Sequence, residues 1–201
     1  MRVRTVVRII SGSWRGRPLV APPGEATRPT SERAREALFS MLASRLGAFE
    51  GLRVADLYAG TGALGLEALS RGAAHATFVE RDRAAVTALN ANIARLGAGA
   101  ATTVLTMPVE AVGRAFKGFD LLLLDPPYGE GLALPALSRL VEYGWVAPHA
   151  LVSVETAKGE VLAPPGFTLD TVRAHGKARL HLFRYGTDDD ATREGTLVAA
   201  P

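Results

Sequence analysis

The chain has 201 residues, a formal net charge of +3 and 48% hydrophobic residues. This length suits one domain with a small extension, which can bury a full core without metals or disulfides. The absence of cysteine excludes a disulfide framework, a thiolate zinc site and a cysteine nucleophile. The apolar runs are too short to span a bilayer, and no apolar segment follows the N-terminal arginines, so we expect a cytoplasmic protein without membrane contact.

The N-terminal part is strongly basic. Residues 1–35 contain eight arginines and two acids, a net charge of +6, so the remainder is mildly acidic. A basic arm on an acidic body indicates a polyanionic partner such as a nucleic acid. The alternative is a solvated arginine-rich surface without a partner.

In chain order, residues 5–20 have the pattern of a short hairpin, with a turn at Ser11-Gly12-Ser13, and residues 21–29 resemble a linker. A helix is expected after Thr30 or Ser31. We therefore expect three parts: a basic hairpin arm and linker at 1–30, a main domain at 31–186, and a flexible tail at 187–201.

From residue 52 onward, apolar strand patterns alternate with helical ones. Strands are expected at 52–58, 76–80, 102–106, 119–125 and 151–155, and helices at 63–71, 83–96, 109–116 and 133–142. Such alternation is typical of an α/β fold with a parallel sheet covered on both faces. The ranges 167–174 and 178–185 differ, because the turn between them predicts an antiparallel hairpin.

A glycine-rich loop follows the first of these strands. Its glycines Gly60, Gly62 and Gly65 have the G-x-G-x-x-G spacing, and Glu80 ends the next strand, where a carboxylate can bind ribose hydroxyls. A nicotinamide cofactor is one interpretation. Asp56 disfavours it, because a carboxylate about 6 Å from a pyrophosphate repels it by about 3 kcal/mol at an effective dielectric near 20.

S-adenosylmethionine, which carries an ammonium and a sulfonium but no phosphate, gains from the same carboxylate. The sequence therefore favours this cofactor. The alternative for Asp56 is a helix cap or a solvated loop acid.

The most specific motif is Asp125-Pro126-Pro127-Tyr128, directly after the buried Leu121–Leu124 run. It lies where open α/β sheets bind ligands, and the two prolines stiffen a loop that offers carbonyl oxygens without competing N–H groups. An exocyclic amine is a poor nucleophile. The Asp125 carboxylate and the Pro126 carbonyl can accept its two hydrogens, and the carboxylate stabilises the positive charge that develops on nitrogen.

Tyr128 can stack on a flipped-out base. The alternative for the motif is a rigid proline turn. No metal is needed for this chemistry, and the four histidines lack metal-ligand spacing.

Several basic and aromatic residues are candidates for contact with nucleic acid. In the arm, Trp14 offers a stacking face between arginines that fit phosphates bidentately; the alternative is that Trp14 caps the core while the arginines are solvated. The full set of candidates is Arg8, Trp14, Arg15, Arg17, Arg28, Arg33, Lys177 and Arg179.

These motifs together resemble the RsmD-type family of bacterial 16S ribosomal RNA guanine-N2 methyltransferases. The resemblance covers about residues 8–185 and rests on Arg8–Gly12 with Trp14–Arg17, Arg28–Thr30 with Arg33–Phe39, Asp56–Gly62, Glu80 and Asp125–Tyr128. It implies a Rossmann-like class I methyltransferase dependent on S-adenosylmethionine, with a seven-stranded, mostly parallel sheet whose last strand is antiparallel, and a small N-terminal hairpin and helix extension. It also implies methylation of one guanine of 16S RNA in an assembled or partly assembled 30S subunit; we expect a monomer.

The resemblance also implies roles for the site residues. The cofactor would be held by Asp56, Tyr58, Gly60, Thr61, Gly62, Gly65, Glu80, Arg81 and Met107, and the catalytic residues would be Asp125, Pro126, Pro127 and Tyr128. One stretch departs from the family pattern. After the third strand such enzymes often carry an acid or amide for the adenine amino group, whereas this chain has Met107-Pro108, so we expect Met107 to pack on the adenine and to offer its N–H to a ring nitrogen.

Three alternatives stay open. The same tetrapeptide serves adenine-N6 methylation of DNA or RNA and glutamine methylation of proteins, although no extra target-recognition domain is apparent. A nicotinamide-dependent oxidoreductase is disfavoured by Asp56. A non-catalytic RNA-binding module would not need the amine-binding tetrapeptide.

Overall fold

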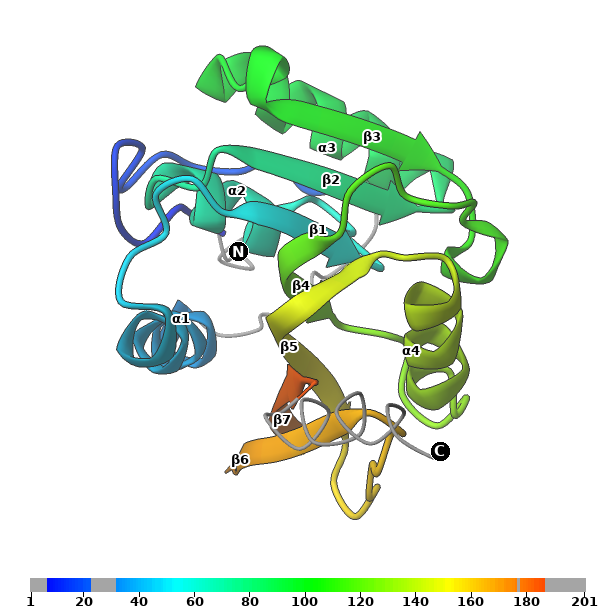
Figure 1. Ribbon diagram of the computed structural model, residues 1–201. Coiled ribbons are helices and arrows are strands. Elements are labelled where there is room, and N and C mark those ends of the chain that lie inside the picture. The colour runs from blue at the N-terminus through cyan, green and yellow to red at the C-terminus, as the bar shows by residue number, and fades with distance from the viewer. Residues whose placement is uncertain (1–6, 23–31, 177, 187–201) are drawn as a thin grey trace, which may run out of the picture.

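The computed structural model describes residues 7–22, 32–176 and 178–186. These residues form a seven-stranded sheet with the strand order β3-β2-β1-β4-β5-β7-β6 (Figure 1). Strands β1 to β5 pair in parallel with one another, and β7 is antiparallel to both β5 and β6. The strands are β1 (Arg53–Leu57), β2 (His75–Glu80), β3 (Thr102–Thr106), β4 (Phe119–Leu124), β5 (Val146–Ala157), β6 (Phe167–His175) and β7 (Ala178–Tyr185).

Helices cover both faces of this sheet. The helices are α1 (Glu32–Leu46), α2 (Ala63–Ser70), α3 (Arg83–Leu96) and α4 (Ala133–Glu142), with short 3-10 turns η1 (Gly99–Ala101) and η2 (Val109–Ala111). Because side chains alternate along a strand, Leu121 and Leu123 of β4 join the core cluster that contains residues of α1, α2 and α3. Leu122 and Leu124 join the cluster beneath α4. The α/β sheet with an antiparallel end is therefore as the sequence predicts.

Two elements differ from the sequence expectation. Strand β5 begins at Val146 rather than at residue 151, because Val146 pairs with Phe119 across a register shift. Pro148 and the positive φ of His149 lie inside this early part, so it lacks a strand-like pattern. The helix expected at 109–116 is only the turn η2, because Val112 is already extended.

The described part of the arm, residues 7–22, lies on the body of the domain. Instead of a strand ladder it has one antiparallel bridge, between Arg8 and Pro18, because proline has no N–H to continue a ladder. Ile9 and Leu19 are buried in the core. Most of the expected linker lies outside the described residues. The expected tail at 187–201 lies entirely outside them.

A buried carboxylate holds the arm against α2. Glu67 is fully buried and accepts the backbone N–H groups of Ile10 at 2.7 Å and Ser11 at 3.0 Å, and it also accepts from the Arg71 guanidinium at 2.8 Å. The Arg35 guanidinium, buried in α1, donates to the carbonyl of Arg8. Burial lowers the pKa of Arg35, and the charge of Glu67 opposes that shift.

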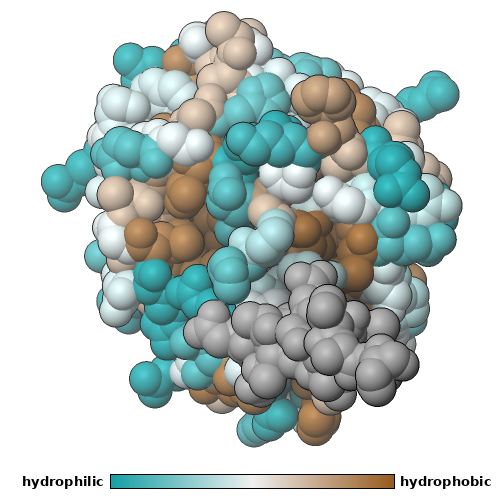
Figure 2. Space-filling view, in the orientation of Figure 1, coloured by the Kyte–Doolittle hydropathy of each residue, from teal (hydrophilic) through white to brown (hydrophobic). Residues whose placement is uncertain are grey.

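The surface gives no simple indication of a binding site. None of the helices in the described ranges is long and apolar enough to cross a membrane. On the face shown in Figure 2, hydrophobic residues reach the surface in separate areas between hydrophilic ones. Hydropathy alone therefore marks no site on this face, and the chemistry at the ends of the strands has to locate it.

Replacing Glu67 should destabilise the protein by much more than replacing a surface acid. We expect Glu67→Ala to lower the free energy of unfolding by about 3 kcal/mol, because it leaves two arm N–H groups and the Arg71 charge without their acceptor. Glu32, whose ion pair with Arg8 is exposed, is the control, and Glu32→Ala should cost less than about 1 kcal/mol. Urea denaturation measures both, and equal losses would contradict the proposed anchoring of the arm.

Candidate active site

Four polar side chains follow one another along the carboxyl edge of the sheet. Leu124 of β4 pairs with Leu57 of β1 and with Val154 of β5. The residues directly after these three are Asp125, Tyr58 and Glu155, and Glu80 ends β2 beside them. Because neighbouring strands are about 4.8 Å apart, the register places these groups next to one another across four strands.

Glu80 anchors the glycine loop from the neighbouring strand. Its two carboxylate oxygens accept the N–H groups of Gly60 and Asp82, each at 2.8 Å. Each carboxylate oxygen has further lone pairs, so these two bonds leave acceptor capacity on Glu80, and the ribose contact stays a prediction. Arg81, which follows it, is exposed.

The three loop glycines serve different purposes. A Cβ at Gly62 would lie 2.4 Å from Leu89, and one at Gly65 would lie 2.4 Å from Phe78, so both allow α2 to pack closely. A Cβ at Gly60 would meet nothing within 4 Å. Gly60 is therefore the glycine whose backbone a ligand can approach. Thr61 in between uses its carbonyl to accept from the buried side chain of Asn92 at 3.0 Å.

Asp56 lies under the loop rather than in it. It is 2% exposed, and its carboxylate accepts the N–H of Gly65 in the first turn of α2 at 2.8 Å. The capping contact that was the alternative for Asp56 is thus present. Burial raises the pKa of Asp56 well above its usual range; the hydrogen bond from Gly65 opposes the rise, and the charges of Asp125 and Glu80 add to it.

This concentration of negative charge tests which cofactor the residues fit. The charges of Asp125 and Glu80 both disfavour a negative charge on Asp56. A ligand with a sulfonium and an ammonium relieves that repulsion, whereas a pyrophosphate increases it. The site therefore fits S-adenosylmethionine.

The structure adds an acid that sequence reasoning missed. Glu110 on η2 accepts from the hydroxyl of Tyr58 at 3.0 Å, and burial together with Glu110 raises the pKa of Tyr58. The only signal was its place three residues after Met107. The N–H of Met107 donates to the carbonyl of Leu105 at 3.1 Å, a bond that the predicted contact with an adenine ring nitrogen would replace. The Met107 side chain packs against the core cluster under α4.

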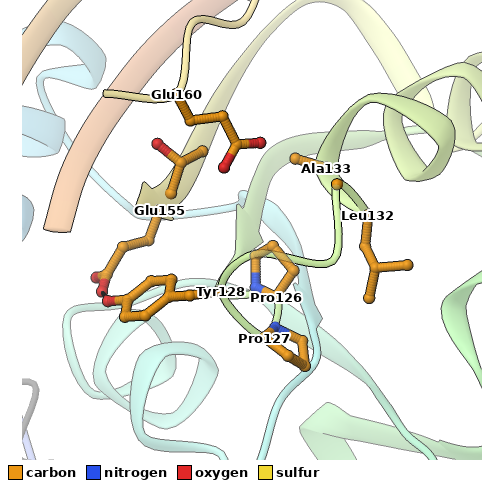
Figure 3. A pocket seen from close by; sticks show the side chains of 9 residues that line it. Pro126, Pro127, Tyr128, Leu132, Ala133, Glu155 and Glu160 are labelled. Carbon is orange, nitrogen blue, oxygen red and sulfur yellow. Dashed lines mark hydrogen bonds between the residues drawn. The ribbon is translucent and has the colours of Figure 1, made fainter. Parts of the chain in front are cut away.

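The tetrapeptide forms one wall of a pocket. The Asp125 N–H donates to the carbonyl of Leu57 at 3.4 Å, Pro126 is buried, and Pro127 is exposed. The Tyr128 hydroxyl donates to the carboxylate of Glu155 (Figure 3). The pocket between the tetrapeptide, the start of α4 and the end of β5 is lined by Pro126, Pro127, Tyr128, Gly131, Leu132, Ala133, Glu155, Thr156 and Glu160. Sequence reasoning did not find Glu155 or Glu160.

The candidates for nucleic-acid contact divide into separate regions. Arg179 on β7 lies beside the pocket, where its guanidinium donates to the main-chain carbonyl of Glu160 at 3.4 Å. Arg33 is exposed on α1, and Arg8 is paired with Glu32. Arg28 and Lys177 lie outside the described residues.

The tip of the arm is at the opposite edge of the sheet. Ser13 donates to the carbonyl of Ser70 at the end of α2, just before β2 begins, and Figure 1 shows this loop on the side where β1 to β3 start. Arg15 is exposed there, and Arg17 donates to the carbonyl of Arg95 at 3.5 Å. Trp14 is half-buried against the core, which favours the core-cap interpretation. In the part of the chain that the structure describes, no three or more acids, histidines or cysteines are grouped as metal ligands.

Known proteins share both the sequence and the architecture. Residues 7–184 match the family described as conserved hypothetical protein 95. The Escherichia coli K12 ribosomal RNA small subunit methyltransferase D is 38% identical over 180 residues, 89% of each chain. The corresponding Haemophilus influenzae protein is 36% identical over 89% of this chain and 93% of its own length.

Solved structures agree. The yhhF protein of Escherichia coli has a TM-score of 0.80 and 36% identity over 90% of this chain and 98% of its own. The magnesium protoporphyrin IX methyltransferase of Synechocystis, solved with bound S-adenosylmethionine, shares the fold at a TM-score of 0.58 and 16% identity, over 77% of this chain and 79% of its own. The chain therefore belongs to the conserved hypothetical protein 95 family and is an S-adenosylmethionine-dependent methyltransferase.

Proposed function

We propose that the chain methylates the exocyclic N2 amine of one guanine in 16S ribosomal RNA, within an assembled or partly assembled 30S subunit. The observation that carries the proposal is the position of the tetrapeptide: it follows β4, whose neighbour β1 leads into the glycine loop, and its residues Pro126 to Tyr128 line a pocket with acidic and aromatic walls. The relatives named as small-subunit ribosomal RNA methyltransferases supply the substrate class. With a ribosomal substrate, we also propose that the protein acts in the bacterial cytoplasm.

The proposed chemistry of the clamp follows from the stiffness of the tetrapeptide. The Asp125 carboxylate and the Pro126 carbonyl accept the two hydrogens of the amine, and this turns the nitrogen lone pair away from the base ring. Positive charge grows on that nitrogen as it takes the methyl group, whose bond to the cofactor sulfur breaks, and the methylated amine then releases one hydrogen as a proton to the Asp125 carboxylate or to water. A carboxylate about 4 Å away stabilises that charge by about 4 kcal/mol at an effective dielectric near 20. Correct positioning of the two reacting groups supplies much of the remaining acceleration.

The cofactor side is proposed to use the residues around the glycine loop. When bound, S-adenosylmethionine supplies an electrophilic methyl group on its sulfonium. Glu80 accepts from ribose hydroxyls, the Gly60 backbone lies against the methionine part, and Asp56 contributes negative charge from below the loop. Tyr58 with Glu110, and the side chain of Met107, border the adenine.

RNA is proposed to contact two basic regions. Arg179 stands next to the pocket, and Arg15 and Arg17 are exposed at the far edge of the sheet, so a folded RNA would have to extend along the molecule to reach both. Such length suits a ribosomal substrate better than a single nucleotide. We propose that the protein acts as a monomer.

The identity of the product tests the function directly. Methyl-labelled cofactor is offered with 30S particles, naked 16S RNA and DNA, followed by digestion to nucleosides. We expect label in N2-methylguanosine, with 30S particles the best substrate. Label in N6-methyladenosine, or none in any nucleic acid, would overturn the proposed function.

Removing the Asp125 carboxylate should abolish transfer without abolishing cofactor binding. We expect Asp125→Ala to lower kcat at least about 100-fold, because the amine loses an acceptor and its charge loses a neighbour. Calorimetry should show cofactor affinity within a few-fold of wild type. Glu142→Gln, an exposed acid at the end of α4, is the control and should keep full activity. Activity of Asp125→Ala within threefold of wild type would reject the clamp.

The salt dependence of RNA binding tests the basic regions. Each arginine that contacts a phosphate of single-stranded RNA contributes about 0.7 to the slope of log K against log salt. Arg179→Gln and the pair Arg15→Gln/Arg17→Gln should therefore each weaken binding and flatten the slope, the pair by about twice as much. An unchanged slope assigns that region another task. Arg114→Gln, at an exposed position before β4, is the matched control.

A further inference from the structure

The pocket beside the tetrapeptide presents hydrogen-bond acceptors to whatever enters it. Glu155 and Glu160 line one side, and Pro126, Leu132 and Ala133 provide apolar walls. Figure 3 shows Glu155 reaching Tyr128 from the end of β5, with Pro126 and Pro127 to one side of them. Acceptors in a partly apolar pocket favour a ligand that carries donors, because a ligand acceptor facing a carboxylate would stay unpaired.

Glu155 is placed next to the amine clamp by the sheet itself. Leu124 and Val154 are paired in register, so Asp125 and Glu155 take the next position on adjacent parallel strands. Residues paired in this way point to the same side of a sheet. The Tyr128 hydroxyl donates to one oxygen of Glu155, which fixes the carboxylate, and the other oxygen keeps lone pairs that can accept a hydrogen bond.

The Watson–Crick edges of the bases differ in what lies next to the exocyclic amine. In guanine the neighbour of the N2 amine is N1–H, a donor. In adenine and cytosine the ring nitrogen beside the amine is an acceptor. When Asp125 and Pro126 hold the exocyclic amine, the neighbouring ring position faces the carboxylate of Glu155. Of the three bases, only guanine presents a donor there.

From this juxtaposition we infer that Glu155 is the residue that selects guanine, by accepting its N1–H while Asp125 and Pro126 hold the N2 amine. The inference rests on the proposed function, since it assumes that a base amine enters the clamp. Glu160 is the weaker candidate, because it lies in the loop after β5 and out of register with Asp125. Tyr128 acts through its ring and through the hydroxyl that orients Glu155.

The test uses a guanine analogue that keeps the amine and loses the donor. 2-Aminopurine has the N2 amine, but its N1 is an acceptor. The full-length enzyme is assayed on 30S particles reconstituted with RNA that carries guanine or 2-aminopurine at the methylated position. Wild type should prefer guanine at least 100-fold in kcat/KM, because a site built to bond a donor rejects an analogue without it.

The variants assign this preference to a residue. Glu155→Gln replaces one oxygen with an NH2 group that can donate to N1 of 2-aminopurine, so it should lower the rate on guanine and reduce the preference at least tenfold. Tyr128→Phe keeps the carboxylate and should slow both substrates while changing the preference less than threefold. Glu160→Gln should also keep the preference. Cofactor affinity of each variant, measured by calorimetry, shows that the fold is intact.

Three outcomes would overturn the inference. Wild type could methylate 2-aminopurine and guanine with the same kcat/KM, and this result can be interpreted without any variant. Glu155→Gln could keep the wild-type preference, or Glu160→Gln could remove it. Each of these outcomes contradicts the inference but not the proposed function, as long as N2-methylguanosine is formed. Absence of that product from wild-type reactions would contradict the proposed function instead.

Discussion

The site depends on the crowding of like charges where four parallel strands end. Asp56, Glu80, Asp125 and Glu155 belong to β1, β2, β4 and β5 or directly follow them, and parallel register brings them to one edge. Several are held by neutral donors: Gly65 N–H for Asp56, Gly60 N–H for Glu80, and the Tyr128 hydroxyl for Glu155. A neutral donor fixes a carboxylate without cancelling its charge. The edge therefore keeps the negative field that suits a cationic methyl donor and an amine becoming positive.

The arm supports the carboxyl edge of the sheet, although the tip of the arm lies at the opposite edge. The side chain of Asn92 in α3 accepts from the Val20 N–H at 2.7 Å and donates to the carbonyl of Thr61 in the glycine loop at 3.0 Å. Glu67 ties the beginning of the arm to α2, the helix that starts at that loop. The arm thus braces the cofactor loop from behind. This gives the basic segment a structural task besides any contact with RNA.

Much of the architecture could be predicted because its signals are local. The bounds of α3, β3 and α4 agree with those read from periodicity and capping residues, and the end of β4 was marked by four consecutive leucines before a proline pair. The start of β5 could not be predicted, since Pro148 and His149 interrupt its pattern and only pairing with β4 extends it.

The glycine loop and the tetrapeptide could also be placed from sequence, whereas the residues that support them could not. Arg35 and Glu67 look like surface residues of amphipathic helices, yet both are buried beneath the arm. Glu110 and Glu155 are single acids outside any motif. Glu110 binds Tyr58, which is 52 residues away in the chain, and Glu155 binds Tyr128, which is 27 residues away. A burial or a contact of this kind depends on tertiary packing and has no local signature.

The segment after the tetrapeptide turns the chain from the sheet into α4. Tyr128 is tied to Glu155, while Gly129 and Gly131 both have positive φ and lead into α4. Glycine pays little for such backbone angles and can change them readily. Gly129 and Gly131 therefore make the turn into α4 without backbone strain, while the Tyr128 hydrogen bond ties the tetrapeptide to β5. The clamp and the turn after it are thus built from adjacent residues of opposite backbone freedom, two prolines with a fixed φ and two glycines.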